Sequence, residues 1–105
     1  MTVWQRGVEL SIAIYDICSR LPQSELYGIC SQMKRAAVSI PSNIAEGHRR
    51  NDKKELRQFL GIALGSAAEL ETQPIITNKV YKDIDVQPAL ALNDEVQRML
   101  HAFIA

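Results

Sequence analysis

Apolar residues recur every three or four positions along most of the chain, and no segment alternates apolar and polar residues as a half-buried strand would. This periodicity predicts four helices separated by short polar or proline-containing connections. The helices are expected at residues 3–21, from an N-cap at Ser24 to a stop at Gly47, from Asp52 to a bend or end at Pro74, and from residues 85–87 onward.

Short connections between neighbouring helices favour an antiparallel up-and-down four-helix bundle, which is an all-α fold. The chain has 105 residues, enough for one hydrophobic core and too few for two, so we expect a single domain over residues 1–105. Hydrophobic residues make up 47% and charged residues 23%, which is typical of a soluble globular protein.

The predicted second helix contains a proline within the stretch RAAVSIPSNIAEG, residues 35–47. Pro41 has no backbone N–H, and its ring presses on the carbonyl of Ala37, four residues back. Apolar positions keep the same phase before and after Pro41, which predicts one kinked helix instead of two. A serine near the proline could donate a hydrogen bond to the carbonyl that lacks a partner.

Polar residues also form a line along this predicted helix, and a similar line on the third helix could face it. One interpretation is a locally satisfied polar flank of a kinked helix. The other, which we favour, is a polar seam between helices or subunits, because a solvated face more usually carries Lys and Glu pairs. The residues of the predicted seam are Arg35, Ser39, Ser42, Asn43, Glu46, Ser66 and Glu69.

The first predicted helix has a wider apolar arc than one small bundle core needs. Besides its core stripe, it carries a second stripe, so we expect a second buried surface. Gly61, Gly65 and Ala68 form a smooth strip on the third helix that would let another helix approach closely. Both features predict that the chain associates with itself in a closed ring. The second stripe consists of Trp4, Val8, Ile12 and Tyr15.

The net charge is zero, but the charges are unevenly distributed. Residues 34–57 hold seven basic and three acidic residues, and the rest of the chain holds five basic and nine acidic residues. Five cations gather where the third helix is expected to start. They form either a solvated turn balanced by Asp52 and Glu55 or a phosphate-binding patch. These cations are Arg49, Arg50, Lys53, Lys54 and Arg57.

Catalytic, metal and cofactor sites are not expected. No glutamate has a histidine three residues later, the spacing that di-iron bundles use, and the histidines lack a carboxylate cluster. Ser42, His48 and Glu46 lack a glycine turn that could bind an oxyanion. Cys18 and Cys30 have no metal-ligand spacing and are interpreted as reduced core thiols. No apolar run reaches membrane-spanning length and no signal-peptide core follows Met1, so we expect a cytoplasmic protein.

The stretches QMKRAAVSIPSNIAEGHRR and FLGIALGSAAELET resemble the 23S rRNA intervening-sequence protein family, also called four-helix bundle proteins. VWQRGVEL and ELYGICSQ fit the same family, so the resemblance covers residues 3–73. Residues 74–105 fit only loosely, because Pro74 and VYKDIDVQPALALND depart from the family's usual leucine-rich continuation and LGY turn.

The resemblance implies an up-and-down four-helix bundle that assembles as a ring, typically a homopentamer, without catalytic activity. The chain is also similar to accessory proteins of diversity-generating retroelements, which bind nucleic acid beside a reverse transcriptase. We therefore predict a non-enzymatic oligomeric adaptor with electrostatic, sequence-indifferent affinity for RNA or DNA. The alternative is a scaffold that binds only other proteins.

Overall fold

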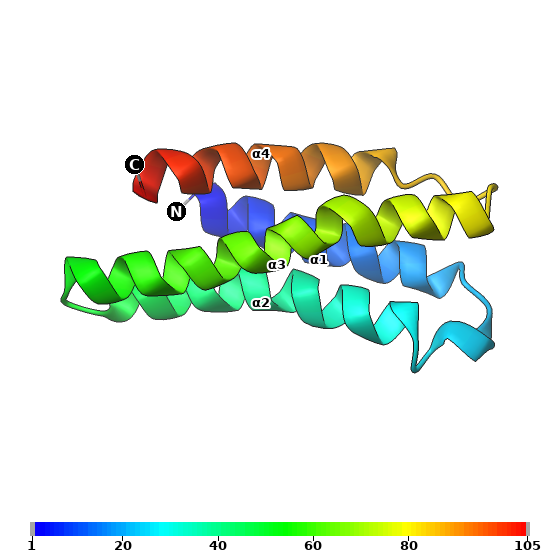
Figure 1. The fold of residues 1–105 in the computed structure, drawn as a ribbon, viewed down its shortest axis with the longest axis horizontal. Helices are drawn as coiled ribbons and strands as arrows, with labels where there is room; N and C mark the ends of the chain where they lie inside the picture. Colours follow the sequence, from blue (N-terminus) through cyan, green and yellow to red (C-terminus); the bar gives the residue numbers. More distant parts are fainter. Residues whose placement is uncertain (1, 105) are drawn as a thin grey trace.

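The computed structural model describes residues 2–104, and within that range the chain is helical without strands. Four long helices lie side by side, and successive helices run in opposite directions along the long axis (Figure 1). The predicted all-α four-helix fold is therefore confirmed. The elements are α1 (Thr2–Ser19), the 3-10 helix η1 (Gln23–Glu25), α2 (Ile29–Arg49), α3 (Lys53–Val80) and α4 (Gln87–Ile104).

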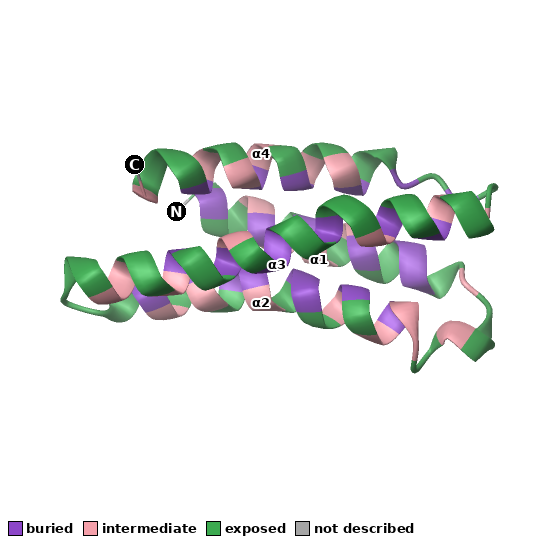
Figure 2. Cartoon of the chain, viewed as in Figure 1, coloured by how far each residue is buried: buried purple, intermediate pink, exposed green. Residues whose placement is uncertain are grey.

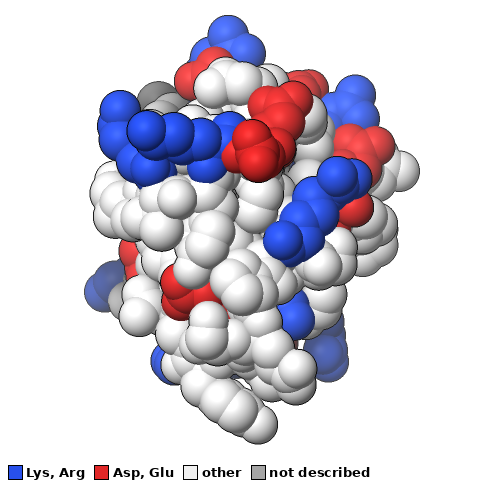
Figure 3. Space-filling model, turned by 90° about the vertical axis from the view of Figure 1, so that its right-hand side faces the viewer, with Lys and Arg blue, Asp and Glu red and all other residues white. Residues whose placement is uncertain are grey.

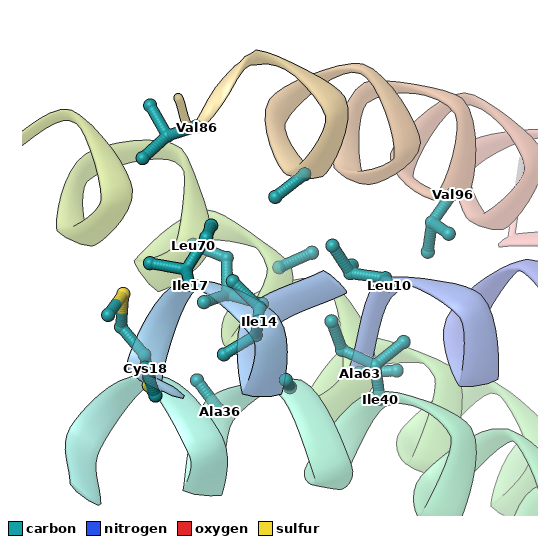
Figure 4. Packing of buried hydrophobic residues seen from close by; sticks show 14 of the residues in the cluster. Leu10, Ile14, Ile17, Cys18, Ala36, Ile40, Ala63, Leu70, Val86 and Val96 are labelled. Atoms are coloured by element: carbon teal, nitrogen blue, oxygen red, sulfur yellow. The ribbon is translucent and has the colours of Figure 1, made fainter. Parts of the chain in front are cut away.

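The core is one cluster of apolar side chains to which all four helices contribute (Figure 4). Leu10 of α1, Ile40 of α2, Leu70 of α3 and Leu100 of α4 are fully buried. Buried residues line the inner side of each helix (Figure 2), as the three-four spacing of apolar positions predicts. Helices α2 and α4 each pack against both α1 and α3, so α1 and α3 occupy opposite corners of the bundle.

The start of α2 differs from the prediction. Ser24 is not the N-cap of a long helix, because it lies within η1, and α2 begins only at Ile29. A tertiary contact accompanies this arrangement: the Tyr81 hydroxyl donates a 2.6 Å hydrogen bond to the carboxylate of Glu25, at the end of η1. This contact joins residues 56 positions apart, so local sequence signals could not reveal it.

Helix α3 neither ends nor begins anew at Pro74, but continues six residues farther to Val80. Pro74 is buried against the core, and Thr77, one turn later, is also buried. The Thr77 hydroxyl donates to the carbonyl oxygen of Gln73 at 2.9 Å. Packing of this last part of the helix outweighs the backbone hydrogen bond that Pro74 cannot make.

Helix α2 likewise runs through Pro41 without interruption. The carbonyl of Ala37, which Pro41 leaves without its usual partner, accepts a 3.0 Å hydrogen bond from the hydroxyl of Ser11. The donor is thus a serine of α1 and not one beside the proline. Gly7, one turn before Ser11, allows this close approach: a Cβ there would lie 3.4 Å from atoms of Ile40 and Pro41.

Candidate functional site

The turn between α2 and α3 forms a tip that projects beyond the ends of α1 and α4 (Figure 1). Only two helices build this tip, and their close approach depends on Gly47. A Cβ at Gly47 would lie 2.9 Å from Cβ of Phe59 and 3.2 Å from Cδ1 of Leu56. Asp52 then starts α3 as the predicted N-cap, because its carboxylate accepts a 3.0 Å hydrogen bond from the backbone N–H of Lys54.

All five cations of the predicted basic patch lie at this tip, and all five residues are exposed. Arg50 differs from the others because carboxylates hold it: its guanidinium lies 2.8 Å from Glu46 and 3.7 Å from Glu55. It also lies 5.1 Å from the centre of the Phe59 ring. Arg50 therefore partly fixes the tip, and much of its charge is offset.

The remaining four cations of the tip form no ion pair with any residue between 2 and 104. Residues 46–57 hold five basic and three acidic residues, so the tip carries a net charge of +2. Phosphate groups could therefore approach these cations without first displacing a protein carboxylate. The four are Arg49, Lys53, Lys54 and Arg57.

The opposite end of the bundle has a different charge pattern. Figure 3 shows this end, where basic and acidic side chains alternate over the upper half and the lower half is mostly uncharged. A small cleft there is lined by Asp16, Arg20, Asp83, Asp85 and Pro88. A surface of mixed sign gives phosphate no preference for this end, so the tip is the better candidate for an anionic polymer.

The structure brings together part of the predicted polar seam. Between α2 and α3, the Ser66 hydroxyl donates to the Ser39 hydroxyl oxygen at 2.9 Å. The amide of Asn43 donates to the carbonyl and hydroxyl oxygens of Ser39, at 2.7 and 2.9 Å. These three residues form a connected hydrogen-bonded group between the two helices.

Arg35 and Glu69 flank this group at the mouth of a polar cleft of about 570 Å³, without pairing with each other in the described structure. Ser42 is exposed and takes part in none of the three hydrogen bonds that join this group. The Glu46 side chain is 38% exposed and pairs with Arg50 one turn later, an exposed ion pair that contributes only about 0.3–0.5 kcal/mol. Any role of the seam in contacts between subunits stays a prediction.

The second apolar stripe of α1 lies on the surface of the isolated chain. Its most exposed members are Ile12 at 65% and Tyr15 at 49%, and Val38 of α2 continues the patch at 42%. The sequence-based stripe missed Val38, although its position outside the core spacing of α2 was an available signal. The resulting α1–α2 apolar face comprises Trp4, Val8, Ile12, Tyr15 and Val38, with Pro41 at the floor of its cleft.

The smooth strip of α3 is also open. Gly61, Gly65 and Ala68 are exposed, and a Cβ built at either glycine would meet nothing within 4 Å. Close packing inside the chain therefore does not offset the cost of about 1 kcal/mol that each glycine imposes on a helix. Ile62, Ile75 and Ile76 add exposed apolar side chains around the strip.

Three other functional features would be visible within residues 2–104, namely a metal site, a membrane-spanning helix and reactive cysteines. No group of three His, Cys, Asp or Glu side chains is arranged to hold a metal ion. None of the described helices combines the length and the apolar character needed to cross a lipid bilayer. Cys18 and Cys30 are buried free thiols, which confirms their predicted place in the core.

These features define a small four-helix bundle with a cationic tip and two open surfaces of apolar or small residues. The model of one family, described as 23S rRNA-intervening sequence protein, matches residues 1–102. The chain belongs to this family. The match extends into α4, to residue 102, well beyond the part of the sequence that carries the recognisable motifs. No curated protein sequence matches the chain.

Proposed function

We propose that this chain is a non-enzymatic, homo-oligomeric adaptor of the cytoplasm whose tip binds the backbone of RNA or DNA. The observation that carries the proposal is the projecting α2–α3 tip with four exposed cations in no described ion pair. The description of its family, which refers to a 23S rRNA intervening sequence, supports a link with RNA.

Binding at the tip would be electrostatic and indifferent to sequence. Lys and Arg side chains that neutralise phosphates release counterions, which makes affinity fall steeply with salt. Phe59 is the one Phe, Tyr or Trp side chain of the described tip, and Arg50 already covers it, so stacking of bases on such a ring contributes little. Four cations on one chain bind weakly, but an oligomer presents several tips to one polymer and gains affinity through multivalency.

The direct test measures the salt dependence of binding to unrelated RNA and duplex DNA sequences. In the test variant, glutamine replaces the four cations of the tip that lack ion pairs. We expect binding to be lost at moderate salt, and the slope of log K against log salt on duplex DNA to flatten by about 0.9 for each lost contact. The substituted residues are Arg49, Lys53, Lys54 and Arg57.

A matched control removes the same number of cations elsewhere, and we expect it to retain affinity. If both variants bind as tightly as the parent, the tip is a solvated turn and the scaffold hypothesis takes its place. If both lose affinity equally, net charge and not the tip governs binding. The control substitutions to glutamine are Arg20, Lys79, Lys82 and Arg98.

Self-association is supported by the α1–α2 apolar face and the open strip of α3. They differ in character, one bearing protruding side chains and the other lacking them, so they suit a head-to-tail contact between copies. Head-to-tail contacts generate a ring when the rotation between subunits closes, and the family resemblance suggests five subunits.

Light scattering coupled to size exclusion tests this part of the proposal. Ile12→Asp places a charge at a position that is 65% exposed, so the isolated chain should fold but remain monomeric. Ala91→Asp, at an exposed position on the outer side of α4, is the control and should leave the assembled mass unchanged. A monomeric parent chain at micromolar concentration would refute self-association.

A further inference from the structure

Two cysteines meet where the end of α1 packs on the start of α2. Cys18 lies in the last turn of α1 and Cys30 in the first turn of α2, and both are buried. The Cys18 sulfur lies 3.8 Å from the carbonyl oxygen of Cys30, and the Cys30 sulfur lies 3.9 Å from the carbonyl oxygen of Cys18. Each thiol thus contacts the backbone of the other residue, which places the two residues directly opposite one another.

We propose that Cys18 and Cys30 are the site of a reversible disulfide that closes the α1–α2 hairpin. A disulfide requires neighbouring backbones and side chains that point toward each other. The reciprocal contacts place each sulfur against the backbone of the other cysteine, so the two backbones are neighbours and each side chain is directed toward the other residue. The bond would close a loop from residue 18 to residue 30, which contains η1. This inference does not depend on nucleic-acid binding or on assembly.

The oxidant is a low-molecular-weight disulfide such as oxidised glutathione. One cysteine thiolate attacks a glutathione sulfur, which forms a mixed disulfide and releases one glutathione thiolate. The second cysteine thiolate attacks the protein sulfur of that mixed disulfide and releases the other glutathione. Two protein thiols are oxidised to one disulfide, one glutathione disulfide is reduced to two thiols, and the two protons pass to the released glutathione.

The closed fold protects the thiols from rapid exchange. Burial raises the pKa of Cys18 to about 12, and hydrogen bonding with the Cys30 side chain adds to the rise. The attacking thiolate therefore forms mainly when the ends of the two helices separate. Most residues between 19 and 27 are exposed, so this connection can open without disturbing most of the core.

The test equilibrates the chain with glutathione. The wild type and two single-cysteine controls, Cys18→Ser and Cys30→Ser, are refolded from urea in buffers of graded ratios of reduced to oxidised glutathione. After acid quenching, intact mass separates a chain that has lost two hydrogen atoms from one that has gained glutathione. We expect the wild type to form the internal disulfide while reduced glutathione is still in excess, and each control to gain a single glutathione at most.

Helical circular dichroism and thermal unfolding of the oxidised wild type complete the test. We expect an unchanged helical signal and a higher unfolding midpoint than for the reduced chain, because the bond restricts the unfolded state. Two free thiols, or bound glutathione, under conditions where the controls become glutathionylated would overturn the proposal. A disulfide between two chains, or an oxidised chain that has lost helical signal, would also overturn it.

Discussion

Alanine substitutions at three helical glycines distinguish effects on the stability of the single chain from effects on its assembly. The three positions have different surroundings. A Cβ at Gly61 or Gly65 of α3 would meet nothing within 4 Å, whereas one at Gly47 of α2 would lie 2.9 Å from Phe59. The same chemical change should therefore stabilise the single chain at the strip and give no net stabilisation at the tip.

The expected magnitudes follow from these distances. Each Gly→Ala change in an open helix interior stabilises by about 0.8–1 kcal/mol, so the double variant of the strip gains about 2 kcal/mol as a monomer. For a small domain, this corresponds to an increase of roughly 8–16 °C in the unfolding midpoint. At Gly47 the same gain is offset by overpacking against Phe59 and Leu56, which costs about 1–3 kcal/mol, so no net stabilisation is expected.

The assay has two parts. Urea and thermal unfolding are measured in the Ile12→Asp background, which isolates the single chain, and light scattering is measured in the parent background. In the parent background, the added methyl groups of Gly61→Ala and Gly65→Ala should prevent a helix of a second copy from packing closely on the strip, and the assembled mass should fall. If the double variant is less stable as a monomer, the conclusion that Gly61 and Gly65 face open space is wrong. If its stability increases and the assembled mass is unchanged, no second copy of the chain packs on the strip.

Three further outcomes follow from single contacts. Ser11→Ala should lower the free energy of unfolding by about 1–3 kcal/mol in urea titrations, because it leaves the carbonyl of Ala37 without its donor. Asp52→Ala should cost about 1 kcal/mol through loss of the α3 N-cap, while Asp52→Asn should cost little. The pKa of Cys18 is raised from 9.0 to about 12 in the folded chain, so the folded state holds this proton more tightly than the unfolded state does. The resulting contribution to the free energy of unfolding is complete below about pH 9 and declines between about pH 9 and pH 12. The stability difference between wild type and Cys18→Ala should narrow across that range, and a constant difference would argue against the raised pKa.

Periodicity and turn residues predicted the four helices because these signals are local. The start of α2 was missed because it coincides with a long-range contact between Tyr81 and Glu25, to which local propensities are insensitive. The sequence left open whether α3 bends or ends at Pro74, because the burial of Pro74 and Thr77 that outweighs the lost backbone hydrogen bond is a tertiary effect.

The predicted basic patch was found at an exposed tip because its five residues are close in sequence and surround one turn. The ion pairs and the aromatic contact of Arg50 depend on how two helices meet, so charge counting could not anticipate them. The seam was predicted from helix faces alone. That method identifies the shared side of Ser39, Asn43 and Ser66, but it cannot show that Glu46 turns toward Arg50.

The hydrogen bond from Ser11 to the carbonyl of Ala37 gives Pro41 a role in helix register. Two helices with similar apolar stripes can slide past each other by a turn with little change in buried area. Here a slide would separate the Ser11 hydroxyl from the one carbonyl that has lost its partner to Pro41, and would also move Gly7 away from the proline ring. Pro41 therefore marks a single position on the continuous helix α2 at which α1 can dock, so the two helices align in one way.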